Sequence, residues 1–177
     1  EKVDVNFSSE SKTKQTQLEL RAVEVESSIS AADKTTGIQY QLYDGRFPYL
    51  PDYSELKPVK QGVVNSLDPT LVDVAGKRSY SIVYTGYIEF PEAGLVRLGM
   101  GSDDGSKLYL KDQLVIDNDF AHGFQMLTRW VRVPRGLVPF RIEYMEVGGD
   151  RGLTLGAAYD IEGKKPVPLK FYTDSSN

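Results

Sequence analysis

The residue types best suited to chemistry in this chain lie on one short segment, Gly101-Ser102-Asp103-Asp104-Gly105-Ser106. Adjacent carboxylates roughly 5 Å apart repel each other by about 3 kcal/mol at an effective dielectric constant of about 20. A hard cation such as Ca²⁺ relieves that repulsion, because it prefers oxygen ligands. Asp103 and Asp104 are therefore candidate metal ligands. The simpler interpretation of the same residues is a solvated hairpin turn, since Asp, Gly and Ser are common turn formers.

A second acidic turn, Glu146 to Gly152, is rich in glycine. Calcium takes about six to eight oxygen ligands and commonly mixes carboxylates with backbone carbonyls, which flexible glycine backbone can supply. Glu146 and Asp150 are candidate side-chain ligands, and Gly148 is a candidate carbonyl ligand. The alternative is a flexible hairpin in which Asp150 is simply solvated.

A third polar loop, residues 117–123, combines acids with an amide, an aromatic ring and the single histidine of the sequence. Asn118, Phe120 and His122 are its candidate ligand-contacting residues, because the loops at the ends of a β-sheet commonly carry function. The alternative is an ordinary connection with Phe120 or Phe124 packed beneath it.

Catalytic motifs are scarce in this sequence. His122 is the only histidine, cysteine is absent, and no Gly-x-Ser-x-Gly elbow or phosphate-binding glycine loop is present. Glycoside hydrolysis needs two carboxylates about 5–10 Å apart, and the many acidic residues leave that alternative open. We expect no enzymatic activity.

The composition is that of a globular chain. Its 177 residues include 21 basic and 25 acidic ones, for a net charge of −4, so we expect no nucleic-acid partner. No apolar run approaches the roughly 20 residues of a membrane helix, so we expect no membrane insertion. The absence of cysteine excludes disulfides and thiolate metal sites. Because the chain begins at Glu1, we interpret it as a processed or excised piece of a larger protein.

From Gly37 onward the sequence alternates short apolar runs with turn residues. No window longer than about ten residues has a convincing helical period, and many short strands with tight turns are typical of an antiparallel sandwich or barrel. We predict an all-β fold, an antiparallel β-sandwich whose functional loops, including the two acidic turns, lie at one end. The expected strands are Ile38–Tyr43, Gly62–Asn65, Tyr80–Phe90, Leu95–Gly99, Lys107–Lys111, Leu114–Asp117, Leu127–Val133, Val138–Met145, Leu153–Tyr159 and Val167–Tyr172.

The first 36 residues differ from the rest because they are rich in Ser, Thr, Lys, Gln and Glu. The alternating stretch Leu18–Ala22 is a candidate strand, and Ser27–Gly37 is interpreted as a polar connector. Residues 1–36 are therefore either an edge strand of the main domain or the tail of a preceding domain plus a linker. Residues 37–177 form the predicted β-sandwich domain.

A series of motifs follows in order from Gly37 to about Tyr172. They are Gly37-Ile38-Gln39-Tyr40-Gln41-Leu42-Tyr43-Asp44-Gly45, Leu50-Pro51-Asp52-Tyr53, Tyr84-Thr85-Gly86-Tyr87-Ile88-Glu89-Phe90, Gly101-Ser102-Asp103-Asp104-Gly105-Ser106-Lys107-Leu108-Tyr109-Leu110, Val115-Ile116-Asp117-Asn118, His122-Gly123 and Glu143-Tyr144-Met145-Glu146-Val147-Gly148-Gly149. With these motifs the chain resembles the protective-antigen fourteen-kilodalton domain family, a β-sandwich module of bacterial toxins, bacterial glycosidases and yeast adhesins.

The resemblance implies roles for the two acidic turns. In lectin members of the family, two adjacent aspartates joined by a cis peptide bind calcium, which coordinates sugar hydroxyls, and a second loop completes the site. The first role carries over onto Asp103 and Asp104, and the second loop corresponds to Glu146–Asp150. Lectin members often have an asparagine in that loop, where this chain offers Glu146 and Asp150.

We therefore expect a non-catalytic carbohydrate-binding module with calcium as its cofactor, in an extracytoplasmic protein such as a secreted or surface glycosidase or adhesin. Its partners would be a glycan or polysaccharide and other domains of the same chain. The alternatives are a structural spacer or protein-interaction sandwich without sugar binding, and a catalytic domain. The expected metal ligands are Asp103, Asp104, Glu146, Gly148 and Asp150, and the expected carbohydrate contacts are Asp103, Asp104, Asn118, Phe120 and His122.

Overall fold

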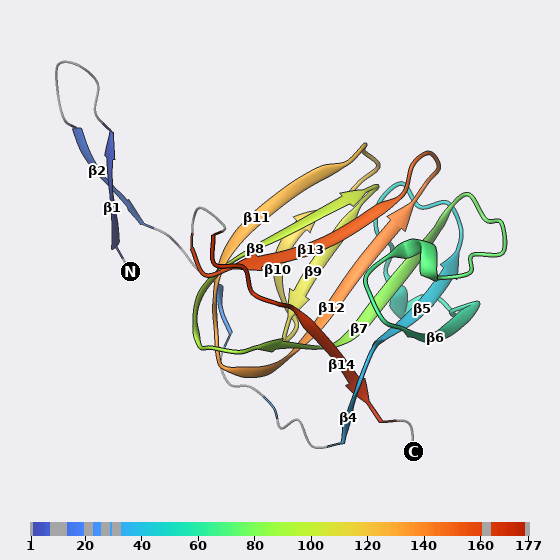
Figure 1. Cartoon of the computed structure of the whole chain (residues 1–177). Helices are drawn as coiled ribbons and strands as arrows, with labels where there is room; N and C mark the ends of the chain where they lie inside the picture. The colour runs from blue at the N-terminus through green and yellow to red at the C-terminus, as the bar shows by residue number, and fades with distance from the viewer. Residues whose placement is uncertain are drawn as a thin grey trace.

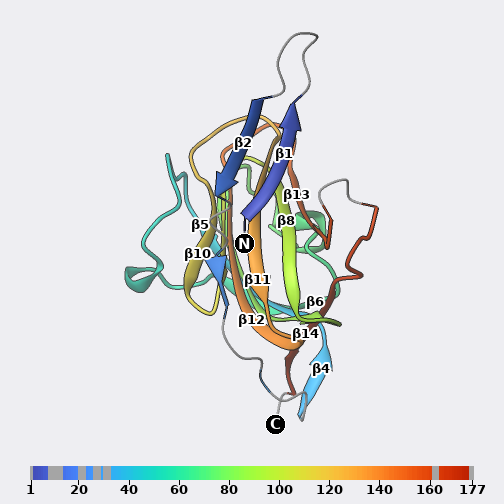
Figure 2. The same cartoon turned by 90° about the vertical axis from the view of Figure 1, so that its left-hand side faces the viewer.

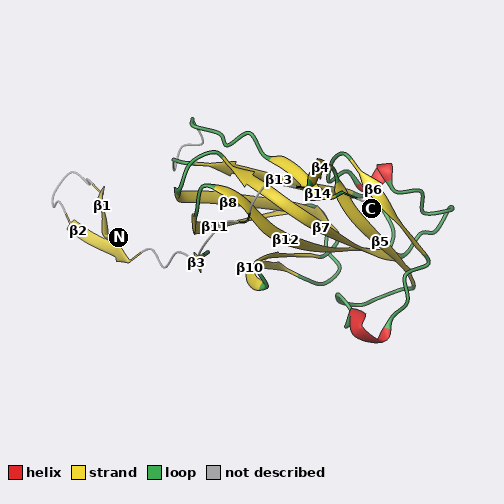
Figure 3. Ribbon diagram, turned by 90° about the horizontal axis from the view of Figure 1, so that it is seen from below, coloured by secondary structure: helices red, strands yellow, loops and turns green. Residues whose placement is uncertain are grey.

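The computed structural model describes residues 2–7, 14–19, 23–25, 29, 33–160 and 164–175 (Figure 1). Helix is confined, within these residues, to two short 3₁₀ turns, η1 (Tyr53–Glu55) and η2 (Pro69–Leu71) (Figure 3). No helix of the described residues is long and apolar enough to cross a membrane. The predicted all-β fold is confirmed. The strands are β1 (Lys2–Phe7), β2 (Lys14–Glu19), β3 (Val23–Glu24), β4 (Lys34–Thr36), β5 (Ile38–Asp44), β6 (Lys60–Val64), β7 (Tyr80–Phe90), β8 (Gly94–Asp103), β9 (Ser106–Leu110), β10 (Gln113–Asn118), β11 (Gln125–Val133), β12 (Gly136–Glu146), β13 (Gly152–Ala158) and β14 (Lys170–Asp174).

Two layered sheets form the body of the described chain, and Figure 2 views the layers from the side. The larger sheet has eight strands. Its main order is β10-β9-β12-β7-β14-β4. In addition, β5 pairs with β7 on one side and with β6 on the other. The smaller sheet has four strands, in the order β13-β8-β11-β3. Among the described strands, every pair is antiparallel except β3 with β11, so the predicted antiparallel sandwich is confirmed.

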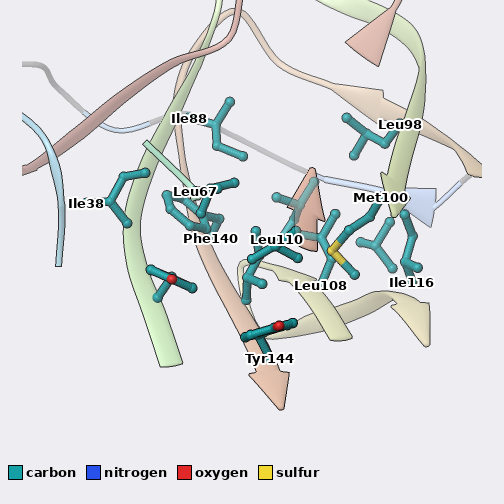
Figure 4. Packing of buried hydrophobic residues seen from close by; sticks show 14 of the residues in the cluster. Ile38, Leu67, Ile88, Leu98, Met100, Leu108, Leu110, Ile116, Phe140 and Tyr144 are labelled. Atoms are coloured by element: carbon teal, nitrogen blue, oxygen red, sulfur yellow. The ribbon is translucent and has the colours of Figure 1, made fainter. Parts of the chain in front are cut away.

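The core lies between the sheets, because each strand directs every second side chain to the same face. Leu98 and Met100 of β8 have no exposed surface, and on the other sheet Leu108, Leu110 and Phe140 are at most 4% exposed. Figure 4 shows these side chains packed together between the two layers. Each buried side chain of this size stabilises the fold by about 1.5–3 kcal/mol. The core therefore holds the two sheets, and with them the loops at their ends, in place.

The aspartate segment contains more strand than the sequence predicts. The predicted strand ends at Gly99, but β8 continues to Asp103, because it pairs with β11 on one side and with β13 on the other. β9 begins at Ser106. The predicted six-residue loop is therefore reduced to a turn at Asp104 and Gly105, held by strands on both sides.

The N-terminal region joins the sandwich at two places. β3 pairs with β11, and Val25, next to it, is buried in the core. The predicted connector Ser27–Gly37 contains a strand, β4, which pairs with the open edge of β14. β1 and β2 pair with each other; β2 ends at Glu19, and the rest of the predicted strand Leu18–Ala22 lies outside the described residues. The division of the chain at residue 36 stays a prediction.

The last strand also differs from the prediction, since β14 begins at Lys170 and not at Val167. The backbone N–H of Val167 donates to the carbonyl of Ala157 in β13 at 2.8 Å. The chain is therefore still attached to the smaller sheet at Val167, and it joins the larger sheet three residues later.

Candidate functional site

The turn between β8 and β9 carries the aspartate pair, and the peptide bond between Asp103 and Asp104 is cis, as the resemblance implies. Gly105 follows, and a Cβ at this position would lie 2.8 Å from the backbone oxygen of Phe120. Real Cβ atoms do not come this close to a backbone oxygen, so any side chain at residue 105 would force the backbone of this loop to shift. The aspartate turn therefore packs directly against the loop between β10 and β11.

Asp104 connects three segments that are far apart in the sequence. Its carboxylate is buried, with 5% of the residue exposed. Oδ1 accepts the backbone N–H of His122 at 2.9 Å, and Oδ2 accepts the backbone N–H of Val147 at 2.9 Å. Figure 1 shows the β10–β11 and β12–β13 loops at the same end of the molecule. The expectation that the two acidic turns meet is confirmed.

Asp103 lies on the more exposed side of the turn. Its backbone carbonyl accepts the hydroxyl of Tyr144 at 2.7 Å. Burial, followed by the negative charges of Asp104 and Asp150, raises the pKa of the Asp103 carboxyl, and the backbone N–H of Phe124 opposes that shift. Negative charge therefore accumulates at this end of the sandwich, and Asp150 contributes to it from the glycine-rich loop.

Glu146 is buried at the end of β12, with 3% of the residue exposed. Its Oε1 accepts the backbone N–H of Gly148 at 2.8 Å, and its Oε2 lies 3.0 Å from the Tyr144 hydroxyl. Burial raises the pKa of Glu146, although these two hydrogen bonds oppose the shift. Tyr144 has one proton and two acceptors, Glu146 and the Asp103 carbonyl.

Two of the expected carbohydrate contacts are engaged in hydrogen bonds within the protein. Asn118 is 5% exposed, and its amide donates to the Ser102 hydroxyl at 3.1 Å and to the Gln125 carbonyl at 3.4 Å. The two ring nitrogens of His122 lie 2.7 Å from the Gly123 carbonyl and 3.1 Å from the Asn118 carbonyl. Asn118 therefore supports the aspartate turn from beneath. The roles of Asn118 and His122 toward a sugar stay predictions.

Aromatic side chains are exposed beside the turn. Phe120 is 63% exposed, and Phe124 is 56% exposed. Phe124 lies over glycines of the smaller sheet: a Cβ at Gly101 would be 2.5 Å from its ring, and one at Gly152 would be 3.8 Å away. Sequence reasoning missed this arrangement of Phe124, and it also missed the part played by Tyr144. The signal that was available is the pair Gly101 and Gly152 on the neighbouring strands β8 and β13, since Gly101 pairs with Thr154 and Gly152 with Asp103.

The donor set suits a hard cation. Asp103, Asp104 and Asp150 offer carboxylate oxygens, and within the described part of the chain none of the three forms a salt bridge. No group of three or more His, Asp or Glu side chains among the described residues is arranged to hold a metal ion by side chains alone. A site here would need backbone carbonyls and water as well, which calcium accepts and soft transition metals do not favour.

The fold and this loop cluster define a class, a β-sandwich module with an acidic site at one end. The sequence profile of the PA14 domain matches residues 37–169. The chain therefore belongs to the PA14 domain family. No curated protein matches the sequence.

Solved structures share the same fold. A PA14 sugar-binding domain from an RTX adhesin is 14% identical, covers 80% of this chain and 99% of its own length, and has a TM-score of 0.62. The A domain of a subtype-switched Epithelial Adhesin 9 from Candida glabrata, solved with β-lactose, is 12% identical over 90% of this chain and 97% of its own, with a TM-score of 0.62. A β-glucosidase from Kluyveromyces marxianus, solved with glucose, is 19% identical over 70% of this chain but 16% of its own, with a TM-score of 0.56. At these identities the likeness establishes the fold.

Proposed function

We propose that this chain is a non-catalytic, calcium-dependent carbohydrate-binding module. The observation that carries the proposal is the position of Asp104, whose two carboxylate oxygens fasten the loops at His122 and Val147 to the aspartate turn. That arrangement brings oxygen donors from separate loops to one end of the sandwich, where no salt bridge among the described residues neutralises their negative charge. A divalent cation from solution would compensate this charge.

Structural relatives support the carbohydrate part of the proposal. One is described as a sugar-binding domain of an adhesin, and another was solved with β-lactose. The β-glucosidase was solved with glucose, and this chain corresponds to a small part of that enzyme. The proposed setting is accordingly extracytoplasmic, with the module attached to other domains of a secreted or surface protein.

Each residue of the site has a proposed role. Asp103 and Asp104 would hold the ion with their carboxylates, and the loop with Gly148 and Asp150 would complete the site. Bound calcium would offer its remaining coordination positions to vicinal sugar hydroxyls. Glu146 would brace the loop, since its Oε1 accepts the backbone N–H of Gly148 and its Oε2 accepts the Tyr144 hydroxyl.

The exposed side chains around the turn have proposed roles toward the sugar. Phe120 and Phe124 are more than half exposed, and aromatic rings of this kind can pack against the apolar face of a sugar ring. His122 would contact the glycan from the β10–β11 loop, and Asn118 would position the turn.

The same geometry argues against catalysis. Glycosidases use two carboxyl groups about 5–10 Å apart on opposite sides of the scissile bond. Asp103 and Asp104 belong to one turn, and Asp104 is turned inward to two backbone N–H groups. They cannot flank a glycosidic bond as acid and base.

Calorimetry on metal-free protein tests the proposal. Calcium should bind with measurable heat, and at about 100-fold excess over the dissociation constant it should stabilise the fold by about 2.7 kcal/mol, seen as a higher melting temperature. A panel of neutral mono- and disaccharides should then bind in calcium and not in chelator. Asp117→Asn, at an exposed aspartate of β10, is the control and should behave as the wild type. A melting temperature unaffected by calcium, with no sugar binding, contradicts the proposal.

A structural module without ligand is the second candidate. It is favoured by the full engagement of Asp104 and Glu146 in hydrogen bonds and by the lack of a three-residue side-chain cluster among the described residues. In that case the aspartate turn only fastens loops together. The calcium titration separates the two candidates directly.

A further inference from the structure

A pocket of about 340 Å³ opens beside the candidate calcium site, between the loop that precedes β7 and the loop from β12 to β13. Glu146 and Gly148 line it, and the residue between them, Val147, donates its N–H to Asp104. The pocket is therefore adjacent to the aspartate turn along the backbone. Ligand pockets have volumes of roughly 300–1,000 Å³, so this one can hold a single sugar ring or its substituent.

The lining of the pocket is positively charged, although the whole chain carries a net charge of −4. Lys77, Arg78 and Arg151 line it together with one carboxylate, Glu146. Lys77 is paired with Asp44 at 2.5 Å. Arg78 and Arg151 are exposed and form no salt bridge within the described residues. The balance stays positive even when Asp44 is counted, and two guanidinium groups remain for an anion.

A buried hydroxyl belongs to the same pocket. Tyr80 of β7 lines it, has no exposed surface, and its hydroxyl finds no hydrogen-bond partner among the described residues. Burial raises the pKa of Tyr80 more than the nearby charge of Arg151 lowers it, so the hydroxyl keeps its proton. Buried polar groups without partners are rare in native proteins. Arg151 and Tyr144 lie near this hydroxyl, but neither meets the geometry of a hydrogen bond to it. A buried hydroxyl beside an arginine that has no salt bridge among the described residues is suited to an incoming acceptor oxygen.

We infer that this pocket binds the acidic group of a glycan, a carboxylate or a sulfate, whose neighbouring sugar ring lies at the Asp103–Asp104 turn. The guanidinium of Arg151 can donate two parallel hydrogen bonds to an oxyanion, and the buried Tyr80 hydroxyl adds another donor. No atom lies within 4 Å of a Cβ built at Gly148 or Gly149, so these two glycines leave free space where they line the pocket. The inference rests on the proposed function for the position of the neighbouring ring, and it specifies anionic saccharides as the ligand class.

The test compares matched neutral and acidic sugars in calcium. Lactose is paired with 6′-sulfolactose, and methyl glucoside with methyl glucuronide, while sodium sulfate alone serves as the free anion. We expect the acidic member of a pair to bind at least tenfold more tightly in about 50 mM salt and to lose most of that advantage in about 500 mM salt.

Two variants and one control assign the effect to the pocket. Tyr80→Phe removes only a hydroxyl that has no hydrogen-bond partner among the described residues, and Arg151→Gln removes an exposed charge. Each should reduce the advantage of the acidic sugar several-fold and leave the affinity for the neutral sugar unchanged. Arg135→Gln changes an exposed arginine in the turn between β11 and β12, at the other end of β11, and should change neither affinity.

The outcomes also separate this inference from the proposed function. Equal binding of both members of each pair in calcium would overturn the acidic pocket and leave the calcium-dependent module standing. Binding of sulfate or glucuronide in chelator, sensitive to Tyr80→Phe and Arg151→Gln, would support the pocket while the calcium proposal fails. Loss of affinity in Arg135→Gln equal to that in Arg151→Gln would reduce the effect to general charge attraction and overturn the pocket, as would no binding of any probe.

Discussion

Two acidic clusters in this domain are built in opposite ways. In the first, on the face of the larger sheet away from the core, every carboxylate has a cationic partner. Asp119 pairs with Lys107 at 2.7 Å, and Glu143 pairs with Arg141, whose guanidinium also lies 4.0 Å from the centre of the Tyr109 ring. We refer to these five residues as the paired cluster.

The second cluster is the aspartate turn, and no cationic side chain among the described residues pairs with it. Asp104 accepts only backbone N–H groups, from His122 and Val147. Backbone N–H groups orient a carboxylate but do not neutralise it. Burial, and after it the negative charge of Asp104, raises the pKa of Asp103. The difference teaches that the paired cluster is neutralised by side chains of the fold itself, whereas the aspartate turn keeps its negative charge, which in our proposal a cation from solution compensates.

Breaking the paired cluster should have the largest effect on stability. Asp119→Ala removes the acceptor of Lys107 and of the backbone N–H groups of Leu50 and Phe120, and we expect a loss of about 2–4 kcal/mol in the free energy of unfolding. Urea denaturation beside Asp117→Ala, an exposed aspartate two residues away, measures it. Equal losses in both variants would contradict the description of this cluster as structural.

The contribution of the Asp119–Lys107 pair to the free energy of unfolding is predicted to depend on pH. Burial alone would raise the pKa of Asp119, but the hydrogen bonds from Lys107, Leu50 and Phe120 hold it below its ordinary value. A depressed carboxyl pKa stabilises the fold above the pKa of the unfolded chain, and this contribution disappears as pH falls through the folded pKa. The difference between wild type and Asp119→Ala should therefore shrink below about pH 4.

Crowding the aspartate turn should have the next largest effect. Gly105→Ala places a Cβ 2.8 Å from the Phe120 backbone oxygen, and we expect a loss of about 1–3 kcal/mol together with weaker calcium binding. Gly156→Ala in β13 is the matched control, because no atom lies within 4 Å of its Cβ. Thermal unfolding should leave Gly156→Ala close to wild type. If the melting temperatures of Gly105→Ala and Gly156→Ala changed by similar amounts, the loop that contains Phe120 would have moved to accommodate a side chain at residue 105.

The two aspartates should respond differently to the same substitution. Asp104→Asn replaces one acceptor oxygen by an amide that faces a backbone N–H, so the metal-free protein should lose about 1–2 kcal/mol. Asp103→Asn relieves repulsion and should leave the metal-free protein equal or slightly more stable. Both should lower calcium affinity at least tenfold, about 1.4 kcal/mol or more. Melting curves with and without calcium measure both quantities, and identical behaviour of the two variants would contradict the assigned roles.

Glu143 gives the smallest predicted effect, a change in pH dependence. Burial raises its pKa, while Arg141 and Lys107 oppose the shift. A raised carboxyl pKa means that the contribution of Glu143 to stability falls as pH rises from about 4.5 through the folded pKa. Glu143→Gln cannot ionise, so relative to the wild type its stability should improve across that range. Thermal unfolding at pH 4.5 to 7 measures this, and parallel curves for the two proteins would contradict it.

The sequence by itself determined the kind of fold and much of the strand pattern. β7 has the predicted bounds Tyr80–Phe90, and β5 differs from its prediction by one residue. These elements are predictable because burial on one face of a strand imposes a local period of two residues on the sequence. The adjacency of Asp103 and Asp104 on a glycine turn is equally local. The extension of β8 through Asp103 could not be predicted from the local sequence, because it depends on pairing with two partner strands.

The tertiary structure alone decided which partners each acidic residue contacts. Asp119 and Asp104 are both loop or turn aspartates in the sequence, yet one meets Lys107 and the other meets the N–H groups of His122 and Val147. Asp104 and Val147 are 43 residues apart, and their contact depends on the pairing of β12 with β7 and β9 and on the packing of two sheets. The open hydroxyl of Tyr80 depends on that packing as well. Such contacts follow from the summed burial of the whole core, which no short stretch of sequence encodes.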